Sequence, residues 1–328
     1  MSQQPLLHID DLHVHFNTSD GVVQAINGAS LTLNPGEIVG LVGESGSGKS
    51  VTAMSILGLV PKPPAVYPKG RILWKGIDLL TTPDRELREI RGGEISMIFQ
   101  DPMTSLNPVY TIGHQISEMI RVHERISAKA AKERSIEMLN LVGVPNPQQR
   151  VDDYPHQFSG GMRQRAMIAM ALSCNPELLI ADEPTTALDV TIQAQILDLL
   201  ERLRKTYNSS IIIITHDMGV VSELSSEVLV MYAGRMVERS TKSSLFANPQ
   251  HPYTKGLMNS VPRVDRARTS RLETISGQPA SLLNLPSGCA FRTRCPSAHV
   301  ACTEQPAFIS DSNGYGAACF LLTQGARS

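Results

Sequence analysis

Strictly alternating and continuously apolar segments divide this chain into predicted strands. Residues 12–16 and 29–33 alternate apolar with polar side chains, which predicts antiparallel β structure near the N-terminal end. Residues 37–42, 178–181 and 211–215 are instead short apolar runs, typical of strands buried on both faces of a parallel sheet. Because helical periodicity separates these runs, we predict an α/β protein with a parallel core.

Helical spacing dominates the middle of the chain. Ile112 and Ile116 fall on one stripe, and Ile136 and Leu139 on another, so we expect a helical subdomain at about 102–172. A further amphipathic helix is expected between the strands at 178–181 and 211–215.

The last part of the chain has a different pattern. A hairpin is expected at about 228–238, and after about residue 250 proline and glycine increase while periodicity fades. We therefore expect one large domain over residues 1–250 and a loop-rich C-terminal extension over 251–328.

Composition narrows the possible functions. Hydrophobic residues make up 41 % of the chain and the formal net charge is -1, which fits a globular protein and argues against nucleic acid as a partner. No apolar run approaches the roughly 18 to 20 residues that span a bilayer. The first residues are not typical of a secretory signal, so we expect a cytosolic protein.

A glycine-rich loop follows the strand predicted at 37–42 and opens a helix. Its pattern is that of a phosphate-binding loop, whose backbone N–H groups turn inward around phosphates at the positive end of a helix. Lys49 is predicted to reach the β- and γ-phosphates, and the Ser50 hydroxyl to ligate Mg²⁺. The nucleotide-binding residues predicted here are Gly43, Glu44, Ser45, Gly46, Ser47, Gly48, Lys49, Ser50 and Val51.

Two carboxylates end the strand predicted at 178–181. Asp182 and Glu183 would stand at the carboxyl edge of a parallel sheet, where ligands bind. We expect Asp182 to hold Mg²⁺ through water and Glu183 to be the general base that orients the attacking water. A helix cap before Pro184 is the competing interpretation when this pair is considered alone.

Phe158-Ser159-Gly160-Gly161-Met162 precedes the acidic pair, and on these motifs together the chain resembles the ATP-binding subunits of ABC transporters. Their signature reads LSGGQ, so Phe158 and Met162 depart from it while the Ser-Gly-Gly core is intact. The resemblance implies that Ser159, Gly160 and Gly161 bind the phosphate of a partner's nucleotide. In isolation, Ser159 would be read as a helix N-cap.

The same resemblance assigns further residues. Gln100 matches the glutamine that senses Mg²⁺ and the attacking water, and Ala187-Leu188-Asp189 matches the D-loop. His216 matches the switch histidine that contacts the γ-phosphate. Phe16 is expected to stack on adenine, with packing into the β layer as the alternative.

The C-terminal extension resembles that of the peptide and nickel importer group of ABC transporters. The likeness rests on residues 251–257, which begin HPYT, on residues 285–296, and on residues 101–108. It implies an ATPase that powers import of dipeptides or oligopeptides, most similar to the dipeptide-importer type. Nickel or other peptide-like cargo, and a soluble ABC ATPase outside transport, are the alternatives.

Four of the five cysteines, Cys289, Cys295, Cys302 and Cys319, fall within the last 40 residues. Cytosolic thiols stay reduced, so such a cluster suggests a metal before disulfides. The spacing does not form paired C-x-x-C knuckles, and thiolates suit zinc or an iron–sulfur cluster. The family resemblance favours a [4Fe–4S] cluster that staples the tail; zinc and free cysteines are the alternatives.

The resemblance also implies a set of partners and a mechanism. These are two transmembrane permease subunits, a second ABC ATPase subunit, either identical or a paralogue, and an extracytoplasmic substrate-binding protein. Mg²⁺ would be held by Ser50, Gln100 and Asp182, with Glu183, His216 and Gln100 as catalytic residues. ATP would close a pair of ATPase domains at the cytoplasmic face of the inner membrane, and hydrolysis would reopen it.

Overall fold

The computed structural model describes residues 4–186, 189–260 and 275–324. The chain divides into two compact units. Unit 1 comprises residues 1–33, 38–80 and 215–328, and unit 2 comprises residues 34–37 and 81–214.

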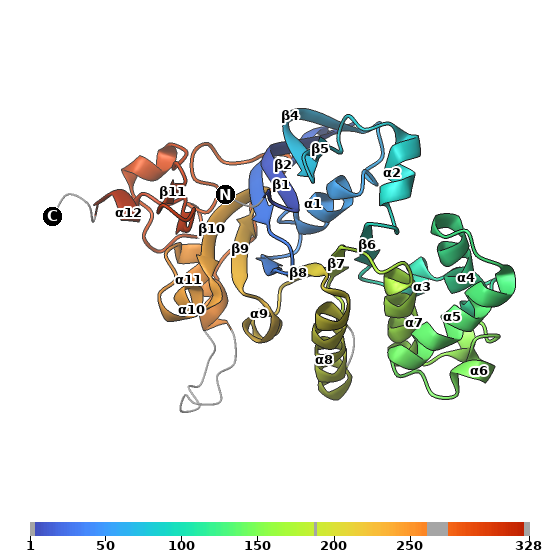
Figure 1. Cartoon of the computed structure of the whole chain (residues 1–328). Helices are drawn as coiled ribbons and strands as arrows, with labels where there is room; N and C mark the ends of the chain where they lie inside the picture. The colour runs from blue at the N-terminus through green and yellow to red at the C-terminus, as the bar shows by residue number, and fades with distance from the viewer. Residues whose placement is uncertain (1–3, 187–188, 261–274, 325–328) are drawn as a thin grey trace. The chain divides into compact units, whose positions relative to one another are not determined.

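Unit 1 contains an antiparallel sheet of four strands in the order β2-β1-β4-β5. Its long strands carry the alternating pattern, and Ile9, Leu12 and Val14 of β1 are fully buried. Figure 1 shows these strands, coloured from blue to cyan, beside helix α1. The bounds are β1 Leu7–Thr18, β2 Gly21–Leu33, β4 Ala65–Trp74, β5 Ile77–Asp78 and α1 Lys49–Ile56.

A second group of strands in unit 1 begins with β3, which pairs in parallel with β9. β9 then forms an antiparallel hairpin with β10, as the sequence predicted, and the short β12 and β11 follow on the far side of β10. The bounds are β3 Ile38–Val42, β9 Glu227–Tyr232, β10 Arg235–Thr241, β11 Ile309–Ser310 and β12 Gly316–Ala317.

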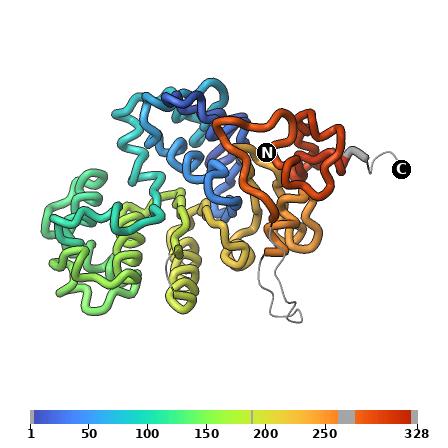
Figure 2. Tube along the Cα trace, turned by 180° about the vertical axis from the view of Figure 1, so that it is seen from behind, coloured from blue at the N-terminus to red at the C-terminus, as the bar shows by residue number. Residues whose placement is uncertain are grey.

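The C-terminal extension folds back onto unit 1. Its path lies beside the N-terminal strands in Figures 1 and 2, and the Gln24 N–H donates to the Leu282 carbonyl at 2.9 Å. The helices of unit 1 that follow residue 215 are short: α9 Met218–Leu224, α10 Lys242–Ala247, α11 Pro252–Asn259, a 3-10 turn Val300–Thr303 and α12 Leu321–Gln324.

Unit 2 combines parallel strands with a group of helices. β6, β7 and β8 pair in parallel through buried, mostly apolar residues, with β7 in the middle. The bounds are β6 Ile95–Ile98, β7 Leu178–Asp182, β8 Ser210–Thr215, α2 Asp84–Ile90 and α8 Val190–Tyr207; Thr215 is counted in unit 1.

The helical part of unit 2 follows from the two predicted apolar stripes. Ile112, Ile116 and Ile120 are buried on α4, as is Leu139 on α5, and Figure 1 shows α4 to α7 packed together in green. The bounds are α3 Pro102–Ser105, α4 Ile112–His123, α5 Ala128–Leu141, α6 Pro147–Arg150, a 3-10 turn Pro155–Gln157 and α7 Gly160–Leu172.

The predicted fold class is confirmed, with an antiparallel β part, parallel strands and a helical part. The boundary at residue 250 stays a prediction. Among the helices in the described part of the chain, none has both the length and the hydropathy that a membrane span needs.

Candidate functional site

The glycine-rich loop of unit 1 connects β3 to α1, and two of its glycines have no possible substitute. Gly43 has a φ of 157°, and a Cβ atom there would overlap the Met231 carbonyl oxygen. Gly48 caps α1 at a φ of 105°, and a Cβ atom would lie 2.6 Å from the Ala25 carbonyl oxygen. Because backbone oxygen atoms of neighbouring segments lie close to the loop at both positions, only glycine allows this backbone conformation.

Two polar side chains of the loop are buried within it. Lys49 is 5 % exposed, and its Nζ donates to the carbonyls of Gly43 at 2.8 Å and Glu44 at 2.9 Å. The Ser47 Oγ is buried and has no hydrogen-bond partner among the described residues. An enclosed ammonium group and hydroxyl at the start of a helix fit an anionic phosphate chain.

The turn between β9 and β10 supports the loop from outside. The Gly234 N–H donates to the Ser47 carbonyl at 2.9 Å, and the Gly234 carbonyl accepts from the Asn27 N–H at 2.7 Å. The loop therefore keeps its shape through backbone contacts with residues far along the chain.

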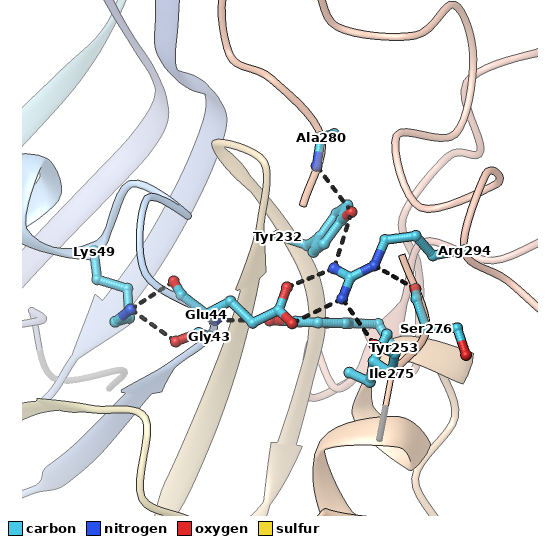
Figure 3. Close-up of polar contacts among 9 residues, drawn as sticks. All are labelled: Gly43, Glu44, Lys49, Tyr232, Tyr253, Ile275, Ser276, Ala280 and Arg294. Atoms are coloured by element: carbon cyan, nitrogen blue, oxygen red, sulfur yellow. Dashed lines mark hydrogen bonds and ion pairs between the residues drawn. The ribbon is translucent and has the colours of Figure 1, made fainter. Parts of the chain in front are cut away.

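The C-terminal extension also reaches the loop, at Glu44 (Figure 3). The Tyr253 hydroxyl accepts a hydrogen bond from the Glu44 N–H, and the Arg294 guanidinium forms an ion pair with the Glu44 carboxylate. Sequence reasoning missed both residues. Tyr253 lies within the HPYT segment, which was the one available signal, and Arg294 lies in a segment considered only for its resemblance.

The acidic pair of unit 2 stands at the end of β7. Asp182 is buried, and Glu183 adopts a φ of 48°, which is strained for a residue with a side chain. The Glu183 Oε2 accepts hydrogen bonds from Gln100 Nε2 at 2.9 Å and from Thr186 Oγ1 at 2.8 Å. The structure thus brings together Glu183 and Gln100, which the sequence assigned to the same reaction.

The Ser-Gly-Gly segment opens α7 in unit 2. The Ser159 Oγ accepts the Met162 N–H at 3.3 Å, so Ser159 is the helix N-cap, and Gly160 has open space where a side chain would be. Gln164 of α7 is buried, and its Nε2 donates to the Pro184 carbonyl at 2.6 Å. The signature helix is thereby bonded to the turn that carries Glu183.

The remaining predicted residues occupy separate places. His216 directly follows β8 and is exposed, whereas Phe16 is half-buried on β1 opposite Val23 and Ala65. Val51 lies in the first turn of α1, and Asp189 caps α8 by accepting the Ile192 N–H at 2.9 Å. The D-loop residues 187 and 188 lie outside the described residues.

The [4Fe–4S] prediction is wrong. The four tail cysteines line one pocket, but its volume is about 20 Å³, about enough for a single water molecule. Among the described residues, no group of three or more His, Cys, Asp or Glu side chains could hold a metal ion. Burial raises the pKa of the Cys289, Cys295 and Cys319 thiols. All four cysteines are free of disulfides in the structure.

The phosphate loop on a strand–loop–helix unit, with an acidic pair ending a parallel strand, defines a P-loop ATPase. A solved structure with this architecture is described as a dimeric post-hydrolysis state of the ATP-binding cassette MJ0796 bound to ADP and Pi. It is 26 % identical to the chain, with a TM-score of 0.65, over 72 % of this chain and 98 % of that one.

Family comparisons divide the chain into two matched regions. Residues 26–186 match the family described as "ABC transporter", and residues 237–302 match "Oligopeptide/dipeptide transporter, C-terminal region". A probable peptide ABC transporter ATP-binding protein of Sinorhizobium fredii, y4tR, is 52 % identical over 96 % of this chain and 94 % of its own. The dipeptide transport ATP-binding protein DppD of Bacillus subtilis is 51 % identical over 98 % and 96 %. The chain belongs to the ABC transporter family, as a subunit that binds and hydrolyses ATP.

Proposed function

We propose that this chain powers the import of dipeptides or oligopeptides through a membrane transporter. The observation that carries the proposal is the phosphate loop around buried Lys49, in a chain whose tail matches the oligopeptide/dipeptide transporter region. The two relatives above, named for peptide transport, support the same cargo class.

The proposed assembly contains two permease subunits and a second ATPase subunit, with a substrate-binding protein on the other side of the membrane. The chain would lie at the cytoplasmic face of the inner membrane. Residues 1–250 would form the ATPase domain, and residues 251–328 the extension.

The phosphate loop binds the nucleotide in this proposal. Lys49 donates to the β- and γ-phosphates, and the inward N–H groups of the loop bind the remaining oxygens. Phe16 stacks on the adenine ring. Because Lys49 already lies inside the loop, phosphate oxygens would replace the carbonyl oxygens that its Nζ now contacts.

Mg²⁺ would neutralise charge on the β- and γ-phosphates, and the hydroxyl, carboxylate and amide oxygens of Ser50, Asp182 and Gln100 are the ligand types it prefers. Asp182 belongs to β7, so its backbone position is fixed by the sheet.

Glu183 is the proposed general base. Its strained backbone and its hydrogen bonds from Gln100 and Thr186 fix the carboxylate in one orientation. A fixed carboxylate can accept a proton from water as that water attacks the γ-phosphate. His216 contacts the γ-phosphate in the same proposal.

The second ATPase subunit completes the proposed mechanism. Ser159, Gly160 and Gly161 of one chain bind the nucleotide held by the other chain's phosphate loop, with Asp189 beside the shared nucleotide. Ser159 and Gly160 are exposed on this chain, which leaves them accessible to a partner. Nucleotide binding closes the pair, and hydrolysis opens it and moves the permease subunits.

Replacing Glu183 with glutamine tests the catalytic assignment. The side chain keeps its shape but can no longer accept the proton, so steady-state ATP turnover should fall by at least about 100-fold while MgATP binding is retained. Glu137→Gln on the exposed side of α5 is the matched control and should hydrolyse ATP at the normal rate. Normal turnover in Glu183→Gln would remove Glu183 as the base.

Affinity purification from membranes tests the assembly. The proposal expects two polytopic membrane proteins to co-purify with the chain, and the reconstituted assembly to accumulate labelled dipeptides or oligopeptides in an ATP-dependent manner. Uptake of nickel without peptide uptake would assign the alternative cargo. Recovery of the chain without any membrane protein would favour an ATPase outside transport.

A further inference from the structure

The outer side of the phosphate loop is held by the C-terminal extension. Figure 3 shows both contacts at Glu44: Tyr253 reaches its backbone and Arg294 its carboxylate. Tyr253 comes from α11 and Arg294 from the loop that follows Phe291. ATP chemistry itself requires neither residue.

Arg294 binds Glu44 with both branches of its guanidinium. Nη1 lies 2.6 Å from Oε2 and Nη2 lies 3.0 Å from Oε1, which is the strong bidentate geometry. The Arg294 side chain is 4 % exposed, and the hydrogen bond with Glu44 raises its pKa above the ordinary range. The guanidinium is therefore charged and largely shielded from water, whereas the Glu44 side chain is 26 % exposed.

The rest of the Arg294 guanidinium is anchored within the extension. Nε donates to the Ser276 carbonyl at 3.0 Å, and Nη2 also approaches the Ile275 carbonyl at 3.4 Å. Nη1 lies 3.4 Å from the Tyr232 hydroxyl, which accepts the Ala280 N–H at 3.2 Å. Because residues of the extension and Tyr232 of β9 fix the guanidinium on several sides, Arg294 can hold Glu44 in one place.

Tyr253 fixes the backbone of the same loop residue. Its hydroxyl accepts the Glu44 N–H at 2.7 Å, and its ring is fully buried. The backbone carbonyl of the same residue, Glu44, accepts a hydrogen bond from Lys49 Nζ at 2.9 Å. The backbone of Glu44 is thus bonded through its N–H to Tyr253 of the extension and through its carbonyl to Lys49 of the phosphate loop.

A loop that binds phosphate through successive N–H groups must be ordered to do so, and ordering it costs conformational entropy. Contacts that order the loop before the nucleotide arrives raise its affinity. We propose that Arg294 and Tyr253 are positioning residues that hold the phosphate loop ready through Glu44, so that the C-terminal extension sets the affinity for MgATP. This inference rests on the proposed nucleotide-binding role of the loop.

Reciprocal coupling follows. If the tail contacts strengthen nucleotide binding, nucleotide must stabilise the tail contacts by the same factor. A partner that shifts the extension would then change the affinity for ATP without touching the phosphate loop.

The test measures the equilibrium dissociation constant of MgATP for the full chain. Either calorimetry or competition with a fluorescent nucleotide analogue gives this constant. Arg294→Met and Glu44→Gln should each weaken binding by about 10- to 100-fold, the range of a charge-assisted contact. The dissociation constant of the double variant should be no more than about threefold higher than that of the single variant with the lower MgATP affinity, because both changes remove the same interaction. Tyr253→Phe removes only the hydroxyl that accepts the Glu44 N–H, and it should weaken binding by about 3- to 10-fold with the ring packing retained.

A second bidentate pair in unit 1 supplies the matched control. Arg239 binds Glu227 through Nε at 2.6 Å and Nη2 at 3.1 Å, between β10 and β9. Arg239→Met and Glu227→Gln should lower the melting temperature and leave the MgATP dissociation constant within about twofold. If these variants weaken MgATP as much as Arg294→Met does, the effect is general destabilisation and the proposal is overturned.

Unchanged MgATP affinity in both Arg294→Met and Tyr253→Phe would also overturn it. Failure of the proposed function is distinguished by Lys49→Ala. If the unmodified chain does not bind MgATP, or if Lys49→Ala binds it equally well, the role of the loop itself falls and the inference falls with it.

Discussion

At the scale of single residues, His251 shows how burial fixes a protonation state. Its side chain is 2 % exposed, and its Nδ1 accepts the Tyr253 N–H at 3.1 Å at the start of α11. Burial lowers the pKa of His251 to about 4, from 6.5. The folded protein therefore contains neutral His251, with an unprotonated Nδ1, in the helix that carries Tyr253.

We predict a pH-dependent loss of stability that His251 causes. As pH falls below about 6.5, His251 of the unfolded chain binds a proton, whereas His251 of the folded chain does not bind one until about pH 4. The free energy of unfolding therefore decreases between these two pH values, by roughly 3 kcal/mol at most. His251→Asn keeps a capping side chain and should abolish this part of the slope. The measurement is urea unfolding of both proteins at several pH values.

Glu238, next to His251, should change the stability in the opposite direction as pH falls. It accepts the N–H groups of Gln250 and His251, and burial raises its pKa, so its protonation favours the folded state as pH falls. Both proteins contain Glu238, so the difference between them isolates His251. A difference that stays constant with pH would contradict the prediction.

At the scale of elements, one buried amide connects α7 to the turn after β7. Gln164 is 3 % exposed and donates to the Pro184 carbonyl at 2.6 Å. Ser159 begins α7 and Glu183 precedes Pro184, so the helix of the signature and the proposed base share a rigid connection. The hydrogen bond fixes the spacing of two elements that are distinct in sequence.

Replacing Gln164 with leucine should lower the free energy of unfolding by about 1–3 kcal/mol, because the Pro184 carbonyl loses its buried donor. Chemical denaturation of the full chain measures this change. Gln149→Leu, at an exposed position on α6, should stay within about 0.5 kcal/mol of the unmodified chain. Equal stability of Gln164→Leu and the unmodified chain would show that the amide is not a significant link.

At the scale of the whole molecule, the extension shares a core with the strands of unit 1. Tyr232 of β9 packs against Tyr253 and Phe291 of the extension, with ring centroids 4.7 and 5.2 Å apart. Val42 of β3 belongs to the same buried cluster. The extension is therefore packed as part of unit 1, and it should not unfold separately.

Phe291→Ala should destabilise the extension and the strands together, by about 3–5 kcal/mol. The single tryptophan, Trp74 on β4, reports on the strands, and thiol labelling of Cys289 reports on the tail. Both transitions should move to the same lower denaturant concentration. Val300→Ala changes a side chain that is 87 % exposed, so it should leave both transition midpoints unchanged. If the two probes of Phe291→Ala report transitions at different denaturant concentrations, the common core is contradicted.

Much of the fold and part of the site could be predicted because their signals are local. The isoleucine run at 211–214 became β8, since such a run is stable only when buried between neighbouring strands. The phosphate loop was recognised from its glycines, whose required conformations the backbone at Gly43 and Gly48 displays. The roles of Phe16, His216 and Asp189 stay predictions.

The sequence by itself determined where the strands, the phosphate loop and the acidic pair occur, because periodicity and turn chemistry depend on adjacent residues. Only the tertiary structure decided that Arg294 meets Glu44 across 250 positions, since no local pattern encodes such a contact. It also decided against the iron–sulfur cluster, because metal binding depends on how packing spaces the thiols, and no group of three or more His, Cys, Asp or Glu side chains among the described residues could hold a metal ion.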